Sequence, residues 1–285
     1  MTAEEPQSAR REHVTPTATS NAPTPRAPAR PEASTLRSLL PPLLALAVTL
    51  VAWEAYIRAA EVPLYLVPAP SDVVAVLART PGRFAAAGFT SLIEALGGLA
   101  VGAGAAFAVA VVMAHSRPLE RALYPLALLV KVTPVVAVAP LFIIWFGFGA
   151  APKVLIAALI TFFPMLVNAV TGLRSVPPAA LDVFRALDAS PWQTFRLLRV
   201  PASLPYVVAA LKISVPLSLI GAVVAEWMSG DGGVGQIILI ANSSLDTASL
   251  FAAVVVLAVL AVALTGAIAL VERRLLSWHE SAEVQ

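Results

Sequence analysis

Residues 250–271 read LFAAVVVLAVLAVALTGAIALV, an apolar run that no charged side chain interrupts. A helix of about twenty apolar residues crosses the roughly 30 Å hydrocarbon core of a membrane. Similar runs recur along the chain and together predict six spans: about 39–60, 89–114, 122–147, 152–173, 205–228 and 250–272. The sequence therefore predicts an all-α, polytopic membrane protein with about six transmembrane helices.

The composition of the whole chain supports this class. Of its 285 residues, 59% are hydrophobic and 13% are charged, whereas soluble domains have about 45–50% apolar and about 25% charged residues. The absence of cysteine excludes disulfides, thiolate metal sites and cysteine nucleophiles. His13, His115 and His279 lack the spacing of metal ligands, so we expect no metal site. The net charge of +2 gives no reason to expect a nucleic-acid partner.

The N-terminal part of the chain differs from the rest. Residues 1–35 are rich in Pro, Ala, Thr and Ser and contain no large apolar cluster, which predicts a disordered cytoplasmic tail. The first apolar run starts near Leu39, too late and too long for a cleavable signal peptide. Residues 36–60 are therefore expected to form a retained first transmembrane helix.

Two connections between the apolar runs have distinct compositions. Residues 61–88 contain many prolines and charges, which predicts a loop with a short amphipathic helix over 71–78 and Ser71 as its N-cap. Residues 229–235 read SGDGGVG but follow a membrane helix and lack the lysine of a phosphate-binding loop. We expect them to form a flexible outer re-entry or gate loop.

The basic residues predict the orientation of the chain, because cytoplasmic connections carry an excess of Lys and Arg. With the N-terminus inside, thirteen basic residues fall on the cytoplasmic side. Four fall outside: Arg58, Arg79, Arg83 and Lys153. Both termini are therefore expected to be cytoplasmic, and the connection between the fourth and fifth spans faces the cytoplasm.

That connection, residues 174–204, has the sequence RSVPPAALDVFRALDASPWQTFRLLRVPASL. Its adjacent prolines suit the start of a first short helix, because the first turn needs no N–H donor there. Apolar residues then recur at helical spacing: Leu181, Phe184 and Leu187. The pattern predicts an amphipathic helix on the cytoplasmic face.

A second short helix follows a break at Asp188 and Ala189. Ser190 is expected to cap it, with Pro191 at its first position. Its apolar face carries Phe195 and Leu198, and its predicted end lies before two prolines, Pro201 and Pro205.

Two short amphipathic helices on the cytoplasmic face have two interpretations. They can lie on anionic lipid, held by arginines and aromatic side chains. They can also dock a soluble partner, as an apolar and basic projection that fits a groove. A transporter that lacks its own phosphate-binding loop must receive energy from a partner, and the chain contains no GxxxxGK[ST] motif.

The stretch 186–205, ALDASPWQTFRLLRVPASLP, resembles the cytoplasmic "EAA" loop of binding-protein-dependent ABC permeases. It is most similar to the nitrate, sulfonate, taurine and thiamine-precursor group. Further matching phrases are LVPAPS at 66–71, TPVVAVAPL at 133–141, WFG at 145–147, FFP at 162–164, AE at 225–226, ERR at 272–274 and Trp278. The resemblance covers residues 60 to 279.

The resemblance implies the type I ABC importer permease architecture in a bacterial cytoplasmic (inner) membrane. It implies a permease core over 61–279, a coupling loop over 174–204 and a short cytoplasmic C-terminal tail over 280–285. It also implies three kinds of partner: ABC ATPase subunits, an extracytoplasmic substrate-binding protein and a second permease copy, with a homodimer expected. The ATPase would bind the ATP, so this chain is expected to hold no cofactor.

The resemblance places ATPase coupling on eleven residues: Leu181, Phe184, Ala186, Leu187, Asp188, Ala189, Ser190, Trp192, Phe195, Leu198 and Pro201. Asp188 departs from the family, which usually has Gly at that position. Asp tolerates the left-handed backbone conformation better than most residues, so the turn is expected to form.

Ionisable residues within predicted spans suggest a translocation pathway. Lys131 and Glu226 lie within apolar runs, and Thr133 and Pro134 follow Lys131. Pro134 and Pro140 must disturb their helix, and broken helices at membrane depth line cavities. We predict that Lys131, Thr133, Pro134 and Glu226 line the pathway. The alternatives are a kinked core helix for the first three and a packing or interfacial role for Glu226.

Small residues in the second span predict close helix packing. Gly97, Gly98, Gly102 and Gly104 have the spacing that lets two membrane helices approach closely.

The predicted function is that of the permease subunit of an ATP-driven importer, without enzymatic activity of its own. A small solute, such as a sulfonate, taurine, nitrate or a pyrimidine-like compound, would cross by alternating access. One rival class is a secondary transporter or channel without an ATPase, which would have several deep charges or inverted repeats. The other is an intramembrane enzyme, which would need paired catalytic groups, yet no predicted span contains His or Asp.

Overall fold

The structure is a computed structural model that describes residues 35–275. It divides into one unit that ends at Val48 and a second that begins at Thr49. Two tails were predicted, over 1–35 and 280–285. Both lie outside the described residues, apart from residue 35.

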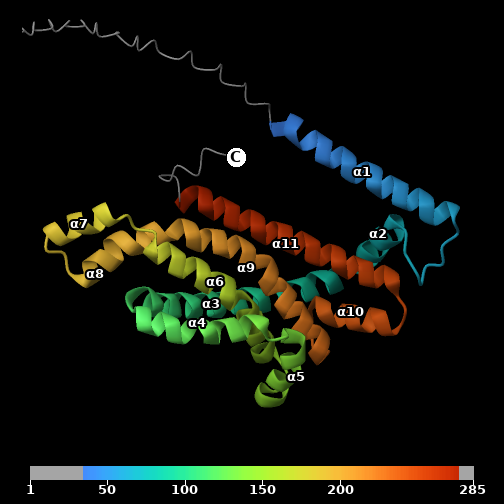
Figure 1. The fold of residues 1–285 in the computed structure, drawn as a ribbon. Helices are drawn as coiled ribbons and strands as arrows, with labels where there is room; N and C mark the ends of the chain where they lie inside the picture. Colours follow the sequence, from blue (N-terminus) through green and yellow to red (C-terminus); the bar gives the residue numbers. More distant parts are fainter. Residues whose placement is uncertain (1–34, 276–285) are drawn as a thin grey trace, which may run out of the picture. The chain divides into compact units, whose positions relative to one another are not determined.

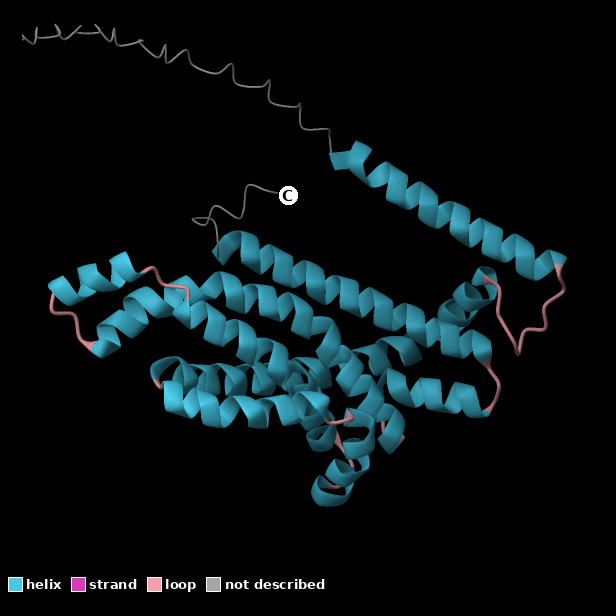
Figure 2. Cartoon of the chain, viewed as in Figure 1, coloured by secondary structure: helices cyan, strands magenta, loops and turns pink. Residues whose placement is uncertain are grey.

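Every regular element between residues 35 and 275 is a helix (Figure 2). In chain order they are α1 (Thr35–Ala59), α2 (Pro70–Arg79), α3 (Pro81–His115), α4 (Arg117–Val132), α5 (Val135–Phe146), α6 (Ala150–Arg174), α7 (Pro178–Ala186), α8 (Pro191–Thr194), the π-helical turn η1 (Phe195–Arg199), α9 (Val200–Ser229), α10 (Gly233–Ser243) and α11 (Thr247–Leu275).

Five helical segments of the described part are long and apolar enough to cross a membrane. They are Leu40–Ala59, Pro81–His115, Ala150–Arg174, Pro191–Ser229 and Thr247–Arg274. α4 and α5 pass the same test only as a pair, which bends by 96° between them. The predicted six spans are therefore found when this pair counts as one.

The bend between α4 and α5 divides the expected span over 122–147 at the position where Pro134 was expected to disturb it. Pro134 has no N–H group, and a proline pushes the preceding residue away from the helical conformation. Thr133 accordingly has an extended backbone (φ −68°, ψ 124°), and its hydroxyl donates to the Leu129 carbonyl at 2.7 Å. Pro140, expected to disturb the helix as well, lies inside α5.

Three long helices, α3, α6 and α9, lie side by side and form the centre of the second unit (Figure 1). Glycines let α3 approach α6, because a Cβ at Gly98 would lie 2.9 Å from the Val154 carbonyl oxygen. A Cβ at Gly102 would lie 2.5 Å from the Ala158 carbonyl oxygen. The packing role predicted for Gly98 and Gly102 is confirmed, whereas Gly104 faces open space.

The segment after α9 is a turn and a short helix rather than the flexible loop expected from its glycines. Gly230, Gly232 and Gly233 have φ between +63° and +73°, and they make the tight turn that starts α10. We call residues 230–233 the glycine turn. α10 buries Val234 and Ile237 against neighbouring helices, because its sequence places apolar residues on the covered face.

The short helix of the first connection, α2, begins at Pro70 with Ala69 as its N-cap. The Asp72 carboxylate accepts a hydrogen bond from the Ala69 N–H at 3.1 Å. The expectation that Ser71 caps this helix is wrong, because its N–H and hydroxyl both donate to Glu54, at 3.0 and 2.8 Å.

Candidate functional site

The predicted coupling loop forms a helical hairpin, which we call the α7–α8 hairpin (residues 178–199; Figure 1). The Ser190 hydroxyl accepts a hydrogen bond from the Gln193 N–H at 3.2 Å. The Gln193 side chain in turn accepts from the Ser190 N–H at 2.7 Å. This reciprocal capping confirms Ser190 as the N-cap and fixes the start of α8.

The turn between the two helices contains Asp188, whose φ of +49° is in the left-handed region. The expectation that Asp accepts the conformation where the family usually has Gly is confirmed. The predicted coupling residues are distributed over the hairpin as follows: Leu181, Phe184 and Ala186 on α7, Leu187 to Ser190 in the turn, Trp192 on α8, Phe195 and Leu198 on η1, and Pro201 at the start of α9.

The second helix of the hairpin does not end before α9, which corrects the expectation that Pro201 and Pro205 stop it. Residues 191–229 form one continuous helical segment. At its π-helical turn the Val200 N–H donates to the Phe195 carbonyl, five residues back. The wider turn accommodates the ring of Pro201, which has no N–H to donate. The hairpin is therefore rigidly continuous with a membrane helix.

The exposed apolar side chains of the hairpin differ in part from the predicted set. Leu187 and Trp192 are 73% and 65% exposed, and so are two residues that the pattern did not single out, Val183 and Leu197, at 57% and 62%. Most of the predicted apolar face is half-buried: Leu181, Phe184, Phe195 and Leu198. Of the four exposed side chains, Leu187 alone belongs to the helical stripe that the sequence predicts for the first helix of the hairpin.

The half-buried residues join the hairpin to the body of the core. The Phe195 ring lies 5.6 Å from the Trp192 ring and 5.5 Å from the His115 ring, measured between centroids. Leu181 lines a small cavity together with His115 and Arg199. These contacts tie the hairpin to the end of α3.

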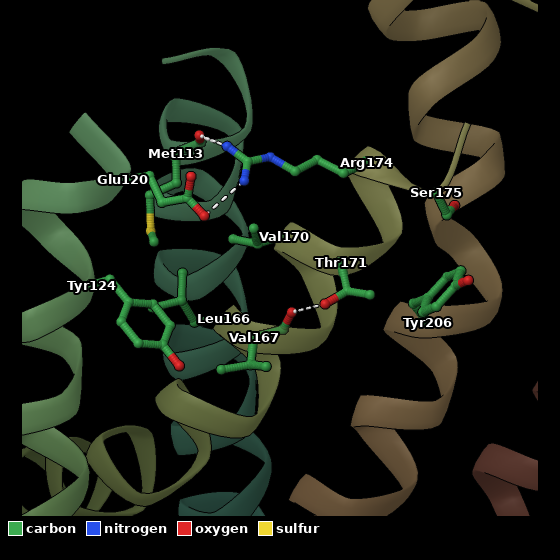
Figure 3. Close-up of a pocket in the computed structure, with 10 residues that line it drawn as sticks. All are labelled: Met113, Glu120, Tyr124, Leu166, Val167, Val170, Thr171, Arg174, Ser175 and Tyr206. Carbon is green, nitrogen blue, oxygen red and sulfur yellow. Dashed lines mark hydrogen bonds and ion pairs between the residues drawn. The ribbon is translucent and has the colours of Figure 1, made fainter. Parts of the chain in front are cut away.

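A larger cavity of about 510 Å³ lies between α3, α4, α6 and α9, at the end of the core that carries the hairpin. Its lining residues are drawn in Figure 3: Met113, Glu120, Tyr124, Leu166, Val167, Val170, Thr171, Arg174, Ser175 and Tyr206. The Arg174 guanidinium donates to the Glu120 carboxylate at 2.7 Å and to the Met113 carbonyl at 2.8 Å. The hydrogen bonds of Arg174 thus connect the end of α6 to α4 and α3, immediately before the hairpin.

The predicted pathway residues fall into two separate environments. Lys131, Thr133 and Pro134 lie at the bend between α4 and α5, where the Lys131 ammonium is 4.8 Å from the centroid of the Phe163 ring. Glu226 lies near the end of α9 and is fully buried. The structure groups the first three and places Glu226 apart from them.

Glu226 belongs to a buried polar cluster that sequence reasoning missed. Its carboxylate accepts a hydrogen bond from the Gly235 N–H at 2.7 Å. Nearby, the Lys153 ammonium donates to Glu94 at 3.0 Å and to the Asp231 carbonyl. We call Glu94, Lys153 and Glu226 the buried cluster.

Lys153 was expected on the outer side as one of four basic residues, yet only 2% of its surface is exposed. Glu94 and Lys153 are separated by 59 residues in sequence. The sequence did contain one signal that Glu94 and Lys153 lie at the same membrane depth: each falls near the outer end of a predicted span.

Gly233→Ala is expected to destabilise the protein more than Gly232→Ala. Both residues have positive φ, +73° and +69°, so either substitution carries a backbone cost of about 1–3 kcal/mol. At Gly232 the nearest atoms to an added Cβ are 3.7 Å away, whereas at Gly233 the Cβ would overlap the Glu226 carboxyl group. Overpacking adds about 1–3 kcal/mol. Thermal unfolding of the two purified variants checks this, and equal losses would contradict the placement of Glu226.

A polytopic helical core that ends in a projecting helical hairpin is the framework of a membrane transport subunit. Residues 98–277 match the family described as binding-protein-dependent transport system inner membrane component. The chain belongs to this family and is the permease subunit of an ABC importer, not an enzyme. The secondary-transporter alternative is not favoured.

The chain is similar to permeases of three bacteria. It is 36% identical to the riboflavin transport system permease protein RibX of Chloroflexus aurantiacus, over 84% of this chain and 92% of that protein. It is 34% identical to the formylaminopyrimidine transport permease protein ThiX of Halalkalibacterium halodurans, over 85% and 96%. It is also 34% identical to the putative aliphatic sulfonates transport permease protein SsuC of Bacillus subtilis, over 68% and 70%.

The fold is similar to that of a chain in the inward facing MetNI methionine ABC transporter. The TM-score is 0.60 at 18% sequence identity, and the match covers 69% of this chain and 98% of that chain. This likeness confirms the fold predicted from the sequence.

Proposed function

We propose that this permease moves its solute when ABC ATPase subunits, bound to the α7–α8 hairpin, change their separation. The observation that carries the proposal is the continuous helix over residues 191–229. Because α8 is the first turn of this helix, a force on the hairpin is transmitted into α9 without a flexible joint. The exposed apolar side chains of the hairpin form the surface that the ATPase subunit contacts.

The hairpin faces the cytoplasm in this proposal, and both chain termini lie on the same side. The supporting observation is the excess of arginine in the connections on that side. The glycine turn and α10 then lie at the outer end, where an extracytoplasmic binding protein delivers the solute. Two copies of the chain face each other across the route, and we propose that they form a homodimer.

The bend between α4 and α5 is the proposed lining of the pathway. Lys131 and Pro134 are exposed there in the single chain, and Thr133 is half-buried. The broken backbone suits a cavity, because unpaired peptide groups are tolerated at membrane depth only where protein or water covers them. For Glu226, complete burial favours the packing alternative over a place in the pathway.

The proposed substrate is a small heterocycle with a pyrimidine-type ring. The relatives named for riboflavin and formylaminopyrimidine transport match 84% and 85% of this chain, whereas the relative named for sulfonates matches 68%. Both named heterocycles contain a pyrimidine ring, which makes this class the shared chemistry.

Co-purification tests the proposed function. After mild solubilisation of native membranes, the tagged chain is expected to carry ATPase subunits with it. In liposomes that contain the complete complex, we expect uptake of a pyrimidine-type solute only when ATP is present on the side of the membrane that carries the ATPase subunits and the binding protein is present on the other side. Uptake by the permease alone would contradict the proposal.

Uptake of a sulfonate but not of a heterocycle would overturn the substrate class and leave the ATPase coupling intact. Candidate compounds are first screened for binding to the partner binding protein encoded in a neighbouring reading frame.

A further inference from the structure

The buried cluster contains the only buried charged side chains among residues 40–274. Glu226 of α9 is 0% exposed, Glu94 of α3 is 4% exposed and Lys153 of α6 is 2% exposed. The buried cluster therefore holds two carboxyl groups and one ammonium group, all with almost no exposed surface. As fully ionised side chains they would carry one uncompensated negative charge.

The hydrogen bonds of the cluster leave two oxygen atoms without a donor. The Lys153 ammonium donates to Glu94 Oε1, and the Gly235 N–H donates to Glu226 Oε2 at 2.7 Å. Glu94 Oε2 and Glu226 Oε1 are buried and receive no hydrogen bond from the described residues. The Glu226 carboxyl faces the side chains of Glu94 and Ser91.

Among the described residues, no nearby side chain supplies the missing positive charge, and a single hydroxyl group is the one side chain that can supply a donor. The Ser91 hydroxyl is the one other polar side chain that faces Glu226 in the described part. Its oxygen accepts from the Val234 N–H at 2.9 Å, and its O–H group remains able to donate one hydrogen bond to Glu226 but brings no positive charge. α5, α10 and the stretch of α11 up to Val271 contain no titratable residue. Asp231 contributes its backbone carbonyl to Lys153, and its side chain would add only negative charge.

Burying a carboxylate without a compensating charge is costly, and two facing carboxyl groups that have only one cation nearby favour binding of a proton. A protonated carboxyl has one O–H donor, whereas a carboxylate has none. We propose that the Glu94–Glu226 pair binds one proton, which supplies a hydrogen bond between the two carboxyl groups. The cluster then carries one positive and one negative charge.

The bound proton holds the glycine turn in place. Glu226 accepts from the third N–H of α10, Ser91 accepts from the second, and Lys153 binds the Asp231 carbonyl within the turn. Three helices thus converge on the start of α10 through the cluster. Loss of the proton leaves two facing carboxylates, whose repulsion pushes Glu226 and the turn away from α3. This proton site goes beyond the transport function and depends on no partner or substrate.

Infrared spectroscopy tests the proton directly. The purified full-length protein, in a detergent without ester groups, is expected to show the carbonyl stretch of a protonated carboxyl at neutral pH. The band is expected to disappear in Glu226→Gln and in Glu94→Gln, because either amide replaces the proton with a permanent N–H donor. A wild-type spectrum that lacks this band would overturn the proposal.

A cysteine reporter distinguishes the effect of removing the bound proton from a general loss of structure. The chain has no cysteine, so Val234→Cys introduces a single, fully buried thiol beside the glycine turn. Its labelling rate is expected to stay within about twofold in either single Gln variant, since each keeps the charge balance and the hydrogen bonds. In the double variant, Lys153 has no counterion, and labelling is expected to accelerate at least roughly tenfold.

Unchanged labelling in the double variant would contradict the role of the cluster in holding the turn. A tenfold acceleration already in either single Gln variant would contradict the proton, because each variant reproduces the charge and the hydrogen bonds of a pair that holds one proton. Glu226→Ala, which removes the acceptor for Gly235, is the positive control for a released turn.

Discussion

Leu187→Asp is expected to abolish ATP-driven uptake and to release the ATPase subunits, while the permease stays folded. Leu187 is 73% exposed and lies in the turn of the hairpin, directly after the last residue of α7. A buried charge without a partner at the centre of an apolar interface costs at least about 2 kcal/mol, the scale of an interface hot spot. This corresponds to roughly thirtyfold weaker association. The measurement is the ratio of ATPase to permease after co-purification, together with uptake.

Leu245→Asp is the matched control. Leu245 is 65% exposed and lies between α10 and α11, at the opposite end of the core. Its φ of +56° is a conformation that Asp accepts well, so the substitution adds the same charge without backbone cost. The control is expected to retain its ATPase. If Leu187→Asp retains both ATPase and uptake, the hairpin is a lipid-surface element, which was the alternative interpretation of its sequence.

This experiment uses Leu187 because its side chain is more exposed than those of the other apolar residues that the sequence pattern indicates. The sequence pattern favours Phe184 and Leu198 equally, because helical spacing indicates a stripe but not which neighbour covers it. In the structure both are half-buried, so Asp at either position would disturb the hairpin itself. Lost ATPase binding would then have two explanations. A single-sequence pattern cannot separate a docking surface from the contact between a helix and its own core.

Local features of the fold were predictable where neighbours in sequence determine them. The cap at Ser190 and the left-handed turn at Asp188 each depend on a few adjacent residues. The bend at Pro134 follows from the missing N–H group and was expected, although its angle was not. At Pro201 the same rule failed, because a π-helical turn five residues long absorbs the ring.

The buried cluster was not predictable, because its members meet only through the packing of three helices. Glu94 falls within the predicted span over 89–114, whereas Lys153 was counted among the basic residues of the outer side. A hydropathy pattern indicates the depth of a residue, whereas the partner across a helix interface depends on the rotation of both helices. The glycines of α3 fix that rotation, since Gly98 and Gly102 must face α6.

Gly102→Leu is expected to prevent folding of the permease core, with little or no monodisperse protein after solubilisation. A Cβ alone would lie 2.5 Å from the Ala158 carbonyl oxygen and 3.0 Å from its Cα atom. Both are backbone atoms of α6 and cannot rotate away. Overpacking by small additions already costs about 1–3 kcal/mol, and a whole isobutyl group against rigid backbone exceeds this. Against a total stability of about 5–15 kcal/mol, the loss is decisive.

Gly104→Leu separates this packing effect from the general consequences of replacing glycine in a helix. Gly104 lies on the same helix, and no atom outside that helix's own backbone lies within 4 Å of an added Cβ. Leucine there gains helix propensity of about 1 kcal/mol and projects into the surroundings of the helix, so normal yield and unfolding temperature are expected. Size-exclusion profiles and thermal unfolding of both variants are the measurements. Because α6 leads into the hairpin and α3 holds Glu94, equal behaviour of the two variants would mean that α3 and α6 are not in close contact. The placement of Lys153 beside Glu94 would then lose its structural basis, and so would the rigid connection from the hairpin into the core.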